Sequence, residues 1–224
     1  DVEKFWETGL LDPASNVQFG EGGAGTFSDG KLNTVVKDPS GRNQFVLETF
    51  VHYGAPEEIT YENKPHIGTD VLSQVIGNMR KDLIAKGAEF HFESCVKDLV
   101  IENGRIAAVV TEEETYPASA VILALGHSAR DTFEMLDAKK EIPMEVKNFA
   151  VGFRVEHPQT MIDTIMYGDY RGAKLPASPY KVTSNFPNGR GVYSFCMCPG
   201  GYVVHASSEE GRSCVNGMSY SGRN

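Results

Sequence analysis

The chain has 224 residues, enough for one large domain or for one domain that carries an insertion. Hydrophobic residues make up 41% and charged residues 23%, an ordinary globular composition that argues against disordered, collagen-like and repeat proteins. Acidic residues outnumber basic ones by 30 to 21, and the formal charge of -9 argues against nucleic-acid binding.

Other properties of the chain bear on its surroundings. The longest apolar run, residues 118–125, is far shorter than the roughly 20 residues that cross a bilayer, so no membrane association is expected. Four cysteines in a chain of this length differ from the dense framework of a small secreted domain. This pattern predicts free thiols in a cytoplasmic protein. The chain opens on Asp1 without a signal peptide and stops at Asn224, and we expect an excised fragment.

The elements of the first half are predicted from hydrophobic spacing. The first 60 residues are rich in glycine and polar side chains, and only residues 44–53 have helical spacing. Their apolar stripe consists of Phe45, Val46, Thr49 and Phe50. A regular amphipathic pattern then predicts a helix that begins at Thr69 or Asp70 and ends at Gly87.

Strand patterns follow this helix. Residues 89–94 alternate between apolar and polar side chains and predict a strand. Two more strands, 99–102 and 105–111, flank Asn103-Gly104, the residue pair that best tolerates the positive φ angles of a tight hairpin. These patterns predict a hairpin at Asn103-Gly104.

A continuously apolar run, residues 121–125, ends at Gly126. This pattern is typical of a strand buried on both faces of a parallel sheet, whose carboxyl end faces a ligand. A short helix over residues 129–136 follows. The sequence therefore predicts an α/β fold in this half.

The character of the chain changes near Glu145. Apolar side chains alternate over residues 149–155 and predict a strand that stops at Pro158. A helix is expected over residues 159–167. Later antiparallel strands are expected over residues 180–185, 191–196 and 202–206. A second, β-rich module is therefore predicted.

A glycine-rich loop at residues 20–25 fits the pattern G-x-G-x-x-G. The preceding residues 15–19 are too polar for a buried strand, and residues 26–31 are turn formers where a helix should begin, so the context argues against a dinucleotide-binding turn. Five glycines between Gly20 and Gly30 still let backbone N–H groups approach a flat or anionic ligand. A flexible surface loop is the alternative interpretation.

Four sequence blocks carry a resemblance to a known family. They are SNVQFGEGGAGTFSDGKL at residues 15–32, HIGTD at 66–70, ALGHSARDT at 124–132 and CMCPGG at 196–201. Together they resemble the FAD-dependent dehydrogenases often described as NAD(FAD)-utilizing dehydrogenases, and the resemblance covers nearly the whole chain.

The resemblance implies a two-part FAD-binding domain with a β-rich inserted substrate domain. Residues 1–144 would belong to the FAD-binding domain, with a flavin-loop segment over 1–60 and a helix, hairpin and parallel strand over 66–137. Residues 145–215 would form the substrate domain, and 216–224 would begin the return to the FAD domain. The nucleotide turn of such proteins lies upstream of Asp1, so this fragment is expected to bind FAD poorly.

The resemblance also implies roles for individual residues. A cofactor-binding role is implied for Gly20, Glu21, Gly22, Gly23, Ala24, Gly25, Thr26, Ser28, Asp29, Lys31, Val96, Ala124, Gly126, His127 and Arg130. A catalytic role is implied for His127, Cys196 and Cys198. The implied activity is an FAD-dependent oxidoreductase that acts on a small-molecule substrate and takes electrons from NADH or NADPH.

Several alternatives remain open from the residues themselves. His127 also fits a structural histidine. Cys196 and Cys198 would share one face of a strand, as a redox pair, as buried unreactive thiols, or with Cys214 and His205 as metal ligands.

Two further alternatives concern the substrate and the class of protein. Arg154 and Glu156 would share a strand face that lines a substrate pocket or faces solvent. A noncatalytic flavin- or nucleotide-binding module is the rival to an enzyme, and a Cys/His metal-binding domain is a further one.

Overall fold

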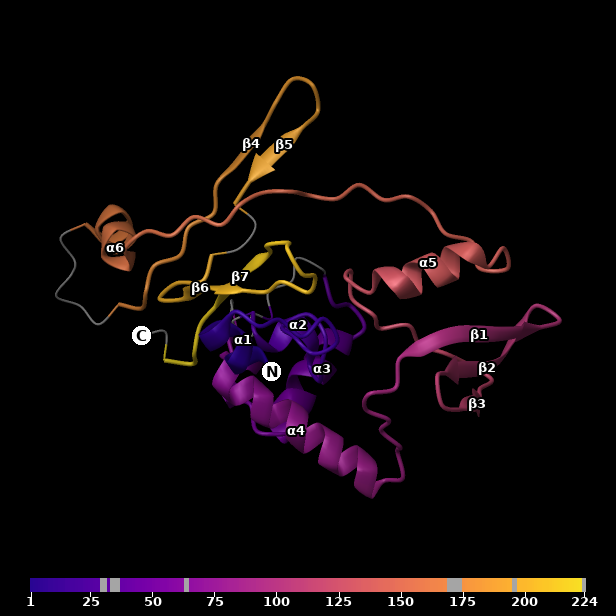
Figure 1. Cartoon of the computed structure of the whole chain (residues 1–224). Coiled ribbons are helices and arrows are strands. Elements are labelled where there is room, and N and C mark those ends of the chain that lie inside the picture. The colour runs from indigo at the N-terminus through magenta and orange to yellow at the C-terminus, as the bar shows by residue number, and fades with distance from the viewer. Residues whose placement is uncertain (29–31, 33–36, 63–64, 169–174, 195–196, 223–224) are drawn as a thin grey trace. The chain divides into compact units, whose positions relative to one another are not determined.

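The computed structural model describes the chain except residues 29–31, 33–36, 63–64, 169–174, 195–196 and 223–224. The chain divides into two compact units. Unit 1 consists of residues 1–83 and 153–224, and unit 2 consists of residues 84–152. Figure 1 shows a mixture of helices and several small sheets. In the part of the chain that the structure describes, every strand pair is antiparallel.

The core of unit 1 is helical. It is formed by α3 (Arg42–His52), the short 3-10 helix η1 (Glu57–Thr60) and α4 (Thr69–Ala85). Leu47, Ile59 and Val75, one from each element, are buried in it. Burial of such apolar side chains is the main source of stability in a small core.

The predicted helices in this region are confirmed, with corrections at their faces and ends. The exposed residues Phe45 and Val46 lie outside the core, because α3 buries Leu47 instead. Gly87 follows α4 with a φ of 93° and donates its N–H to the carbonyl of Ile84, as a glycine at a helix end does. The hydroxyl of Thr69 has no hydrogen-bond partner, so it does not cap α4.

The N-terminal segment of unit 1 packs against a two-stranded sheet. Helix α1 (Val2–Thr8) contacts the end of β6 (Tyr202–His205), which pairs with β7 (Val215–Met218). The indole of Trp6 donates a hydrogen bond of 2.9 Å to the carbonyl oxygen of His205. Segments 199 residues apart in the sequence therefore meet in this unit.

The start of α4 is tied to the segment after β7, an arrangement that we call the 68–221 junction. The N–H of Thr69 donates to the carbonyl of Ser219 (3.3 Å). The carboxylate of Asp70 accepts hydrogen bonds from the backbone N–H (2.9 Å) and hydroxyl (2.6 Å) of Ser221. Gly68 lies beside them with a φ of 89°. The junction joins two segments of unit 1 that are far apart in sequence.

The rest of unit 1 contains α6 (Gln159–Tyr167) and a hairpin of β4 (Thr183–Asn185) and β5 (Gly191–Tyr193). The helix confirms its sequence prediction, and the strands are shorter than predicted. The side chain of Gln159 links three segments, because its amide nitrogen donates to Ser178 O (3.0 Å) and its oxygen accepts from Gly200 N (3.1 Å).

Unit 2 contains a three-stranded antiparallel sheet and one helix. The sheet consists of β1 (Val96–Glu102), β2 (Arg105–Thr111) and β3 (Thr115–Pro117), in that order. Asn103 and Gly104 join β1 to β2 with φ angles of 52° and 72°, which confirms the predicted hairpin. Helix α5 (Arg130–Ala138) contacts β1 and confirms the helix predicted there.

Three strand predictions are wrong. Residues 89–94, 121–125 and 149–155 contain no strand, although each has the side-chain pattern of one. Figure 1 draws the chain between α5 and α6 without an arrow. A strand needs a neighbour for its backbone hydrogen bonds, and the described residues supply none to these segments. The predicted buried parallel strand at 121–125 is instead an exposed segment.

Among the helices that the structure describes, none combines the length and the apolar character needed to cross a bilayer.

An ion pair in unit 2 leads to a pH-dependent prediction. The ammonium of Lys139 lies 2.7 Å from the carboxylate of Asp98, and this hydrogen bond lowers the pKa of Asp98. A carboxyl whose pKa is lower in the folded state stabilises the fold above its unfolded value, and this stabilisation is lost as the pH falls through the folded pKa. Because both side chains are partly exposed, we expect Asp98→Asn to cost less than about 1 kcal/mol at pH 7.

At pH 2 the substitution should cost less than at pH 7, because more of the carboxyl is then protonated in the folded state. The measurement is hydrogen exchange of the β1 amides in the whole chain at the two pH values. Glu102→Gln, at the exposed end of the same strand, is the control. An equal effect of Asp98→Asn at both pH values would contradict the assignment.

Candidate functional site

The glycine-rich loop of unit 1 is a sharp turn followed by one turn of helix. Helix α2 (Gly23–Thr26) has only four residues, and Asn16 and Phe19 before it form an isolated bridge and no longer strand. The structure therefore agrees that no strand–turn–helix of the dinucleotide-binding type occurs here. No neighbouring atom lies within 4 Å of the place that a Cβ would take on Gly20, Gly23 or Gly25. The loop presents open backbone at these three positions.

Contacts with unit 1 hold the loop in place. The carboxylate of Glu21 lies 2.7 Å from the guanidinium of Arg80 on α4. Gly22 has a φ of 80°, and a Cβ there would lie 2.2 Å from the hydroxyl oxygen of Thr26. That hydroxyl is buried and has no hydrogen-bond partner. Only glycine fits at position 22 without displacement of Thr26.

The remaining predicted loop residues divide into two groups. Ala24 lies in α2, and Ser28 lies two residues after the end of this helix. The N–H of Ser28 donates to the carbonyl of Gly25 (3.2 Å). Asp29 and Lys31 lie outside the described residues, so their predicted cofactor contacts stay predictions.

Next to the loop, the structure brings together Phe27, Arg154, Cys198, Asn216 and Gly217, a group that we call the Arg154 cluster. The amide of Asn216 donates to the carbonyl of Phe27 (3.2 Å). The oxygen of the same amide accepts from the guanidinium of Arg154 (3.4 Å). A side chain on β7 thus connects Arg154 to Phe27, which lies two residues after the glycine-rich loop.

Cys198 lies in this cluster too. A Cβ on Gly217 would lie 2.8 Å from the thiol sulfur of Cys198 and 3.0 Å from Nη1 of Arg154, so the thiol and the guanidinium are neighbours. Cys198 is in a turn and not in a strand, because the N–H of Gly201 donates to its carbonyl (2.9 Å).

The pairing of the two cysteines stays a prediction. Cys196 lies outside the described residues, so the expected common face of Cys196 and Cys198 is not tested. Within the described ranges, no group of three or more histidine, cysteine, aspartate or glutamate side chains is arranged to hold a metal ion.

Sequence reasoning named Arg154 and Cys198 but missed Asn216 and Gly217 as site residues. The side chains of Arg154 and Glu156 lie on one side of their segment, as expected. The carboxylate of Glu156 accepts a hydrogen bond from the N–H of Val203 on β6 (3.0 Å), and Arg154 contacts Asn216 on β7. Asn216 and Gly217 carry no periodic or motif signal, because their roles arise from contacts with distant segments.

The other predicted site residues belong to unit 2. The imidazole Nδ1 of His127 lies 2.8 Å from the hydroxyl of Ser128, and His127 itself is exposed. Gly126 precedes it with a φ of 66°, and Arg130 begins α5. Val96 is the first residue of β1, and Ala124 lies in the exposed segment 121–125. Gly126, His127 and Arg130 are neighbours in the sequence of unit 2. The described residues contain no buried strand that ends at Gly126, although one was predicted there.

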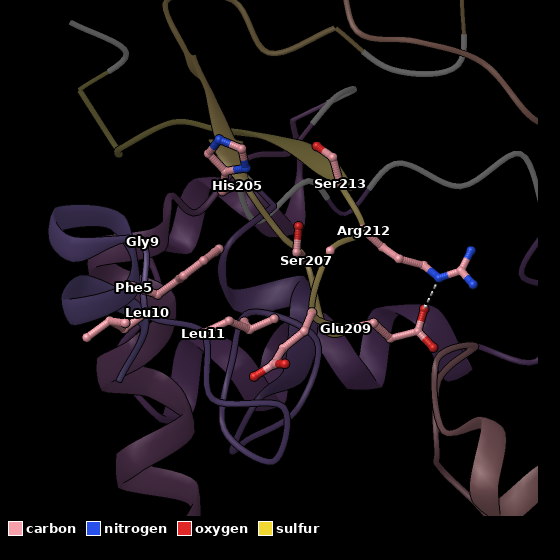
Figure 2. A pocket seen from close by; sticks show the side chains of 11 residues that line it. Phe5, Gly9, Leu10, Leu11, His205, Ser207, Glu209, Arg212 and Ser213 are labelled. Atoms are coloured by element: carbon pink, nitrogen blue, oxygen red, sulfur yellow. Dashed lines mark ion pairs between the residues drawn. The ribbon is translucent and has the colours of Figure 1, made fainter.

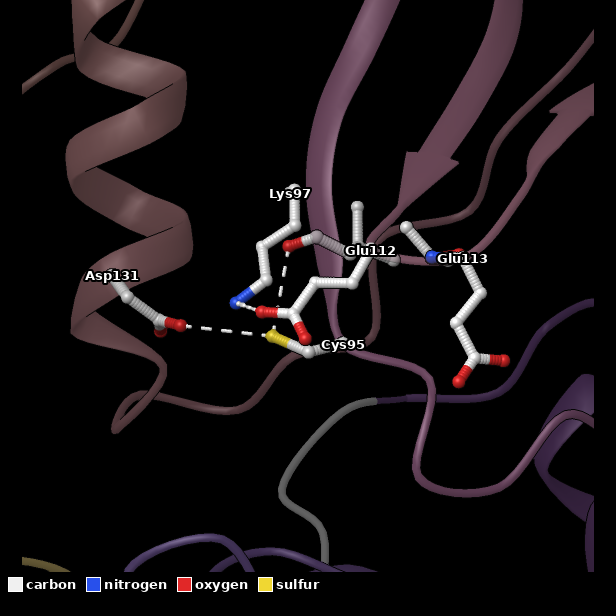
Figure 3. Close-up of polar contacts among 7 residues, drawn as sticks. Cys95, Lys97, Glu112, Glu113 and Asp131 are labelled. Carbon is white, nitrogen blue, oxygen red and sulfur yellow. Dashed lines mark hydrogen bonds and ion pairs between the residues drawn. The ribbon is translucent and has the colours of Figure 1, made fainter.

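A polar group in unit 2 includes a cysteine that sequence reasoning did not single out (Figure 3). Cys95 lies 3.9 Å from the carboxylate of Asp131, and Lys97 lies 2.7 Å from that of Glu112. The hydrogen bond with Lys97 lowers the pKa of Glu112, and the same bond raises the pKa of Lys97. All of these side chains are solvent-accessible, so the group is a surface ion pair beside a thiol.

A pocket of about 340 Å³ lies in unit 1. In Figure 2, the apolar side chains of Phe5, Leu10 and Leu11 line one side of it. Arg212 and Glu209 on another side form an ion pair of 3.6 Å. Neither the glycine-rich loop nor Cys198 lines this pocket.

The described residues fit FAD only in part. The open backbone at Gly20, Gly23 and Gly25 leaves room for a flat ring. The buried hydroxyl of Thr26, which has no hydrogen-bond partner, lies next to Gly22 of the same loop. No strand–turn–helix of the described part points backbone N–H groups at a diphosphate. The described residues alone therefore do not enclose a dinucleotide.

Comparison with known proteins shows what the chain resembles. Residues 148–224 match the family described as FAD-dependent protein, C-terminal domain-like. The chain is 49% identical over 224 residues to an uncharacterized protein of Clostridium beijerinckii. The similar region covers 99% of this chain but 42% of that protein. The chain thus spans less than half the length of this relative, and its last third resembles the C-terminal domain of FAD-dependent proteins.

Proposed function

We propose that this chain is part of an FAD-dependent oxidoreductase that transfers electrons between NADH or NADPH and a small-molecule substrate. The observation that carries the proposal is the contact between Asn216 and Phe27. Asn216 lies in the segment that matches the FAD-dependent family, and Phe27 lies two residues after the glycine-rich loop, at the C-cap of α2. This contact supports the proposal that the family-like segment and the loop with open backbone contribute to one site.

The Arg154 cluster suggests how the chain would contribute to such a site. Flavins supply the hydride chemistry, and the protein supplies binding, orientation and charge. In this proposal the open backbone of the loop lies against the flavin, and Arg154 attracts an anionic group of the cofactor or substrate. Cys198 lies next to Arg154, so its thiol would contact the same bound group. The cofactor-binding roles of His127 and Gly126 that the resemblance implies stay predictions.

The proposed domain organisation follows the same logic. Residues 1–144 would belong to the FAD-binding domain and residues 145–215 to a substrate domain, with residues 216–224 returning to the FAD-binding domain. This is supported by the family match, which begins at residue 148, and by the return of β7 to the glycine-rich loop.

The first test is FAD binding by this chain alone, measured by isothermal titration. We expect no binding in the submicromolar range. The diphosphate would lack several charge-assisted hydrogen bonds, each of which contributes roughly 1.5–3 kcal/mol, so its affinity falls by orders of magnitude. Submicromolar binding would show that the loop or Gly126 forms a complete site and would contradict this assignment.

The second test concerns the oxidoreductase activity. A chimera in which this chain replaces the similar 42% of the clostridial relative should show the absorbance of bound flavin, and NADH or NADPH should bleach it. Bound flavin that neither nucleotide bleaches would favour a noncatalytic flavin-binding module. A folded chimera that takes up no flavin would overturn the proposal.

A further inference from the structure

The pocket beside α1 is built from two segments of unit 1, and we call it the α1–β6 pocket. One segment runs from Phe5 in α1 to Leu11, and the other runs from His205 at the end of β6 to Ser213. The structure describes every residue of both segments. The volume of about 340 Å³ is at the lower end of the range of small-molecule sites.

Contacts between the two segments hold the walls of the pocket together. The indole of Trp6 donates to the carbonyl oxygen of His205 (2.9 Å), and the rings of Phe5 and His205 meet edge to face with centroids 6.0 Å apart. The hydroxyl of Ser207 accepts a hydrogen bond from the N–H of Cys214 (3.2 Å). The walls are therefore in place without a ligand, and a preformed site loses less conformational entropy on binding.

One wall of the pocket is apolar. Figure 2 shows Phe5, Leu10 and Leu11 on the same side. The exposed fraction of Leu10 is 66%, so apolar surface is left for a ligand to cover. Removal of such surface from water favours binding of a ligand with an apolar body.

The other wall carries charged side chains with an excess of negative charge. It contains Glu209, Glu210 and Arg212. The guanidinium of Arg212 lies 3.6 Å from the carboxylate of Glu209, so these two charges offset each other. Within the described part of the chain, the carboxylate of Glu210 has no hydrogen-bond or ion-pair partner. The charge of the lining therefore favours a cation over an anion.

We propose that the α1–β6 pocket binds a small organic cation, a primary amine joined to an apolar body. The apolar body lies against Phe5, Leu10 and Leu11, and the ammonium group lies at the carboxylate of Glu210. A neutral ligand of the same shape loses the ion pair, and an anion meets the excess negative charge. The pocket is lined by neither the glycine-rich loop nor Cys198, so this inference does not depend on flavin binding.

The test uses three probes that share a phenyl group and differ in charge. They are phenethylamine, phenethyl alcohol and phenylpropionate. Each is titrated into the chain and followed by the fluorescence of Trp6, which reports on the pocket because its indole is bonded to His205. We expect phenethylamine to bind about threefold to fivefold more tightly than the alcohol, the range for an ion pair at an exposed carboxylate, and phenylpropionate to bind most weakly.

Substitution of Glu210 tests the ammonium site. Glu210→Gln should remove the difference between phenethylamine and phenethyl alcohol, and it should leave binding of the alcohol unchanged. Glu7→Gln makes the same chemical change at an exposed residue of α1 that does not line the pocket, and we expect it to leave the difference in place. Equal effects of the two substitutions would overturn the proposal, because they would show that only the net charge of the chain matters.

Substitution of Leu10 tests the apolar wall. Leu10→Ala should weaken the amine and the alcohol by the same factor, because both probes lose the same apolar contact. Leu83→Ala is the control, since Leu83 is an exposed leucine of α4 outside the pocket. Urea unfolding of each variant checks that a weaker signal does not come from a loss of the fold.

Three outcomes decide against the proposal. No saturable binding of phenethylamine to the folded chain would mean that the pocket is not a ligand site. Equal affinities for the three probes would mean that Glu210 does not select a charge. Tightest binding of phenylpropionate would make Arg212 the anchor of an anion site. Since none of these measurements uses flavin, their failure is distinguishable from failure of the proposed oxidoreductase function.

Discussion

Substitution of Gly68 by alanine should destabilise unit 1 by about 3–5 kcal/mol. The φ of Gly68 is 89°, and a left-handed conformation alone costs an alanine roughly 1–2 kcal/mol. A Cβ there would also lie 2.3 Å from the backbone nitrogen of Ser221. Backbone cannot move aside as a flexible side chain can, so the hydrogen bonds between Asp70 and Ser221 would break, at about 1 kcal/mol each or more.

The measurement is urea unfolding followed by the fluorescence of Trp6, the single tryptophan of the chain, which lies in unit 1. Gly77→Ala is the matched control, because Gly77 lies inside α4 with no neighbour within 4 Å of the added carbon. That substitution should stabilise the helix by up to about 1 kcal/mol. Similar midpoints for the two variants would mean that the 68–221 junction does not form.

Substitution of Ile59 by alanine should cost about 2–4 kcal/mol. Ile59 lies in η1 and is 1% exposed, among Leu47, Ile67 and Val75 of the unit 1 core. Removal of buried methyl groups loses their transfer free energy and leaves a cavity that the surroundings fill only in part. Since total stabilities are typically 5–15 kcal/mol, the variant should unfold at a clearly lower urea concentration.

The control is Ile165→Ala on α6, an identical change at a residue that is 69% exposed. We expect an effect below about 0.5 kcal/mol there. Thermal unfolding of both variants and the parent chain provides a second measurement. Equal shifts for the two substitutions would contradict the assignment of Ile59 to the core.

Sequence patterns predicted the elements whose causes are local. The apolar spacing of α4 and the closing Gly87 determine a helix without help from distant residues. Asn103-Gly104 determines a hairpin because both residues tolerate a positive φ. Residues 121–125 and 149–155 have strand-like patterns but form no strand in the structure. A strand needs a neighbouring strand for its backbone hydrogen bonds, and the pattern of one segment does not indicate whether such a neighbour exists.

The candidate site shows the same limit. The glycine-rich loop and Cys198 were predicted from sequence blocks, but the role of Asn216 depends on Phe27, 189 residues away. Position 22 requires glycine because the hydroxyl of Thr26 lies where a Cβ would be, and this contact exists only in the folded loop. Contacts between segments distant in sequence therefore account for what the patterns missed.

The 68–221 junction has a consequence for the order in which the chain folds. Asp70 and Ser221 are 151 positions apart, and closing a loop of that length costs roughly 4 kcal/mol of chain entropy. Unit 2 is continuous from residue 84 to 152, and the helical core of unit 1 lies within residues 47–75. During synthesis, both can therefore form before the 68–221 junction, which closes only after Ser221 has left the ribosome.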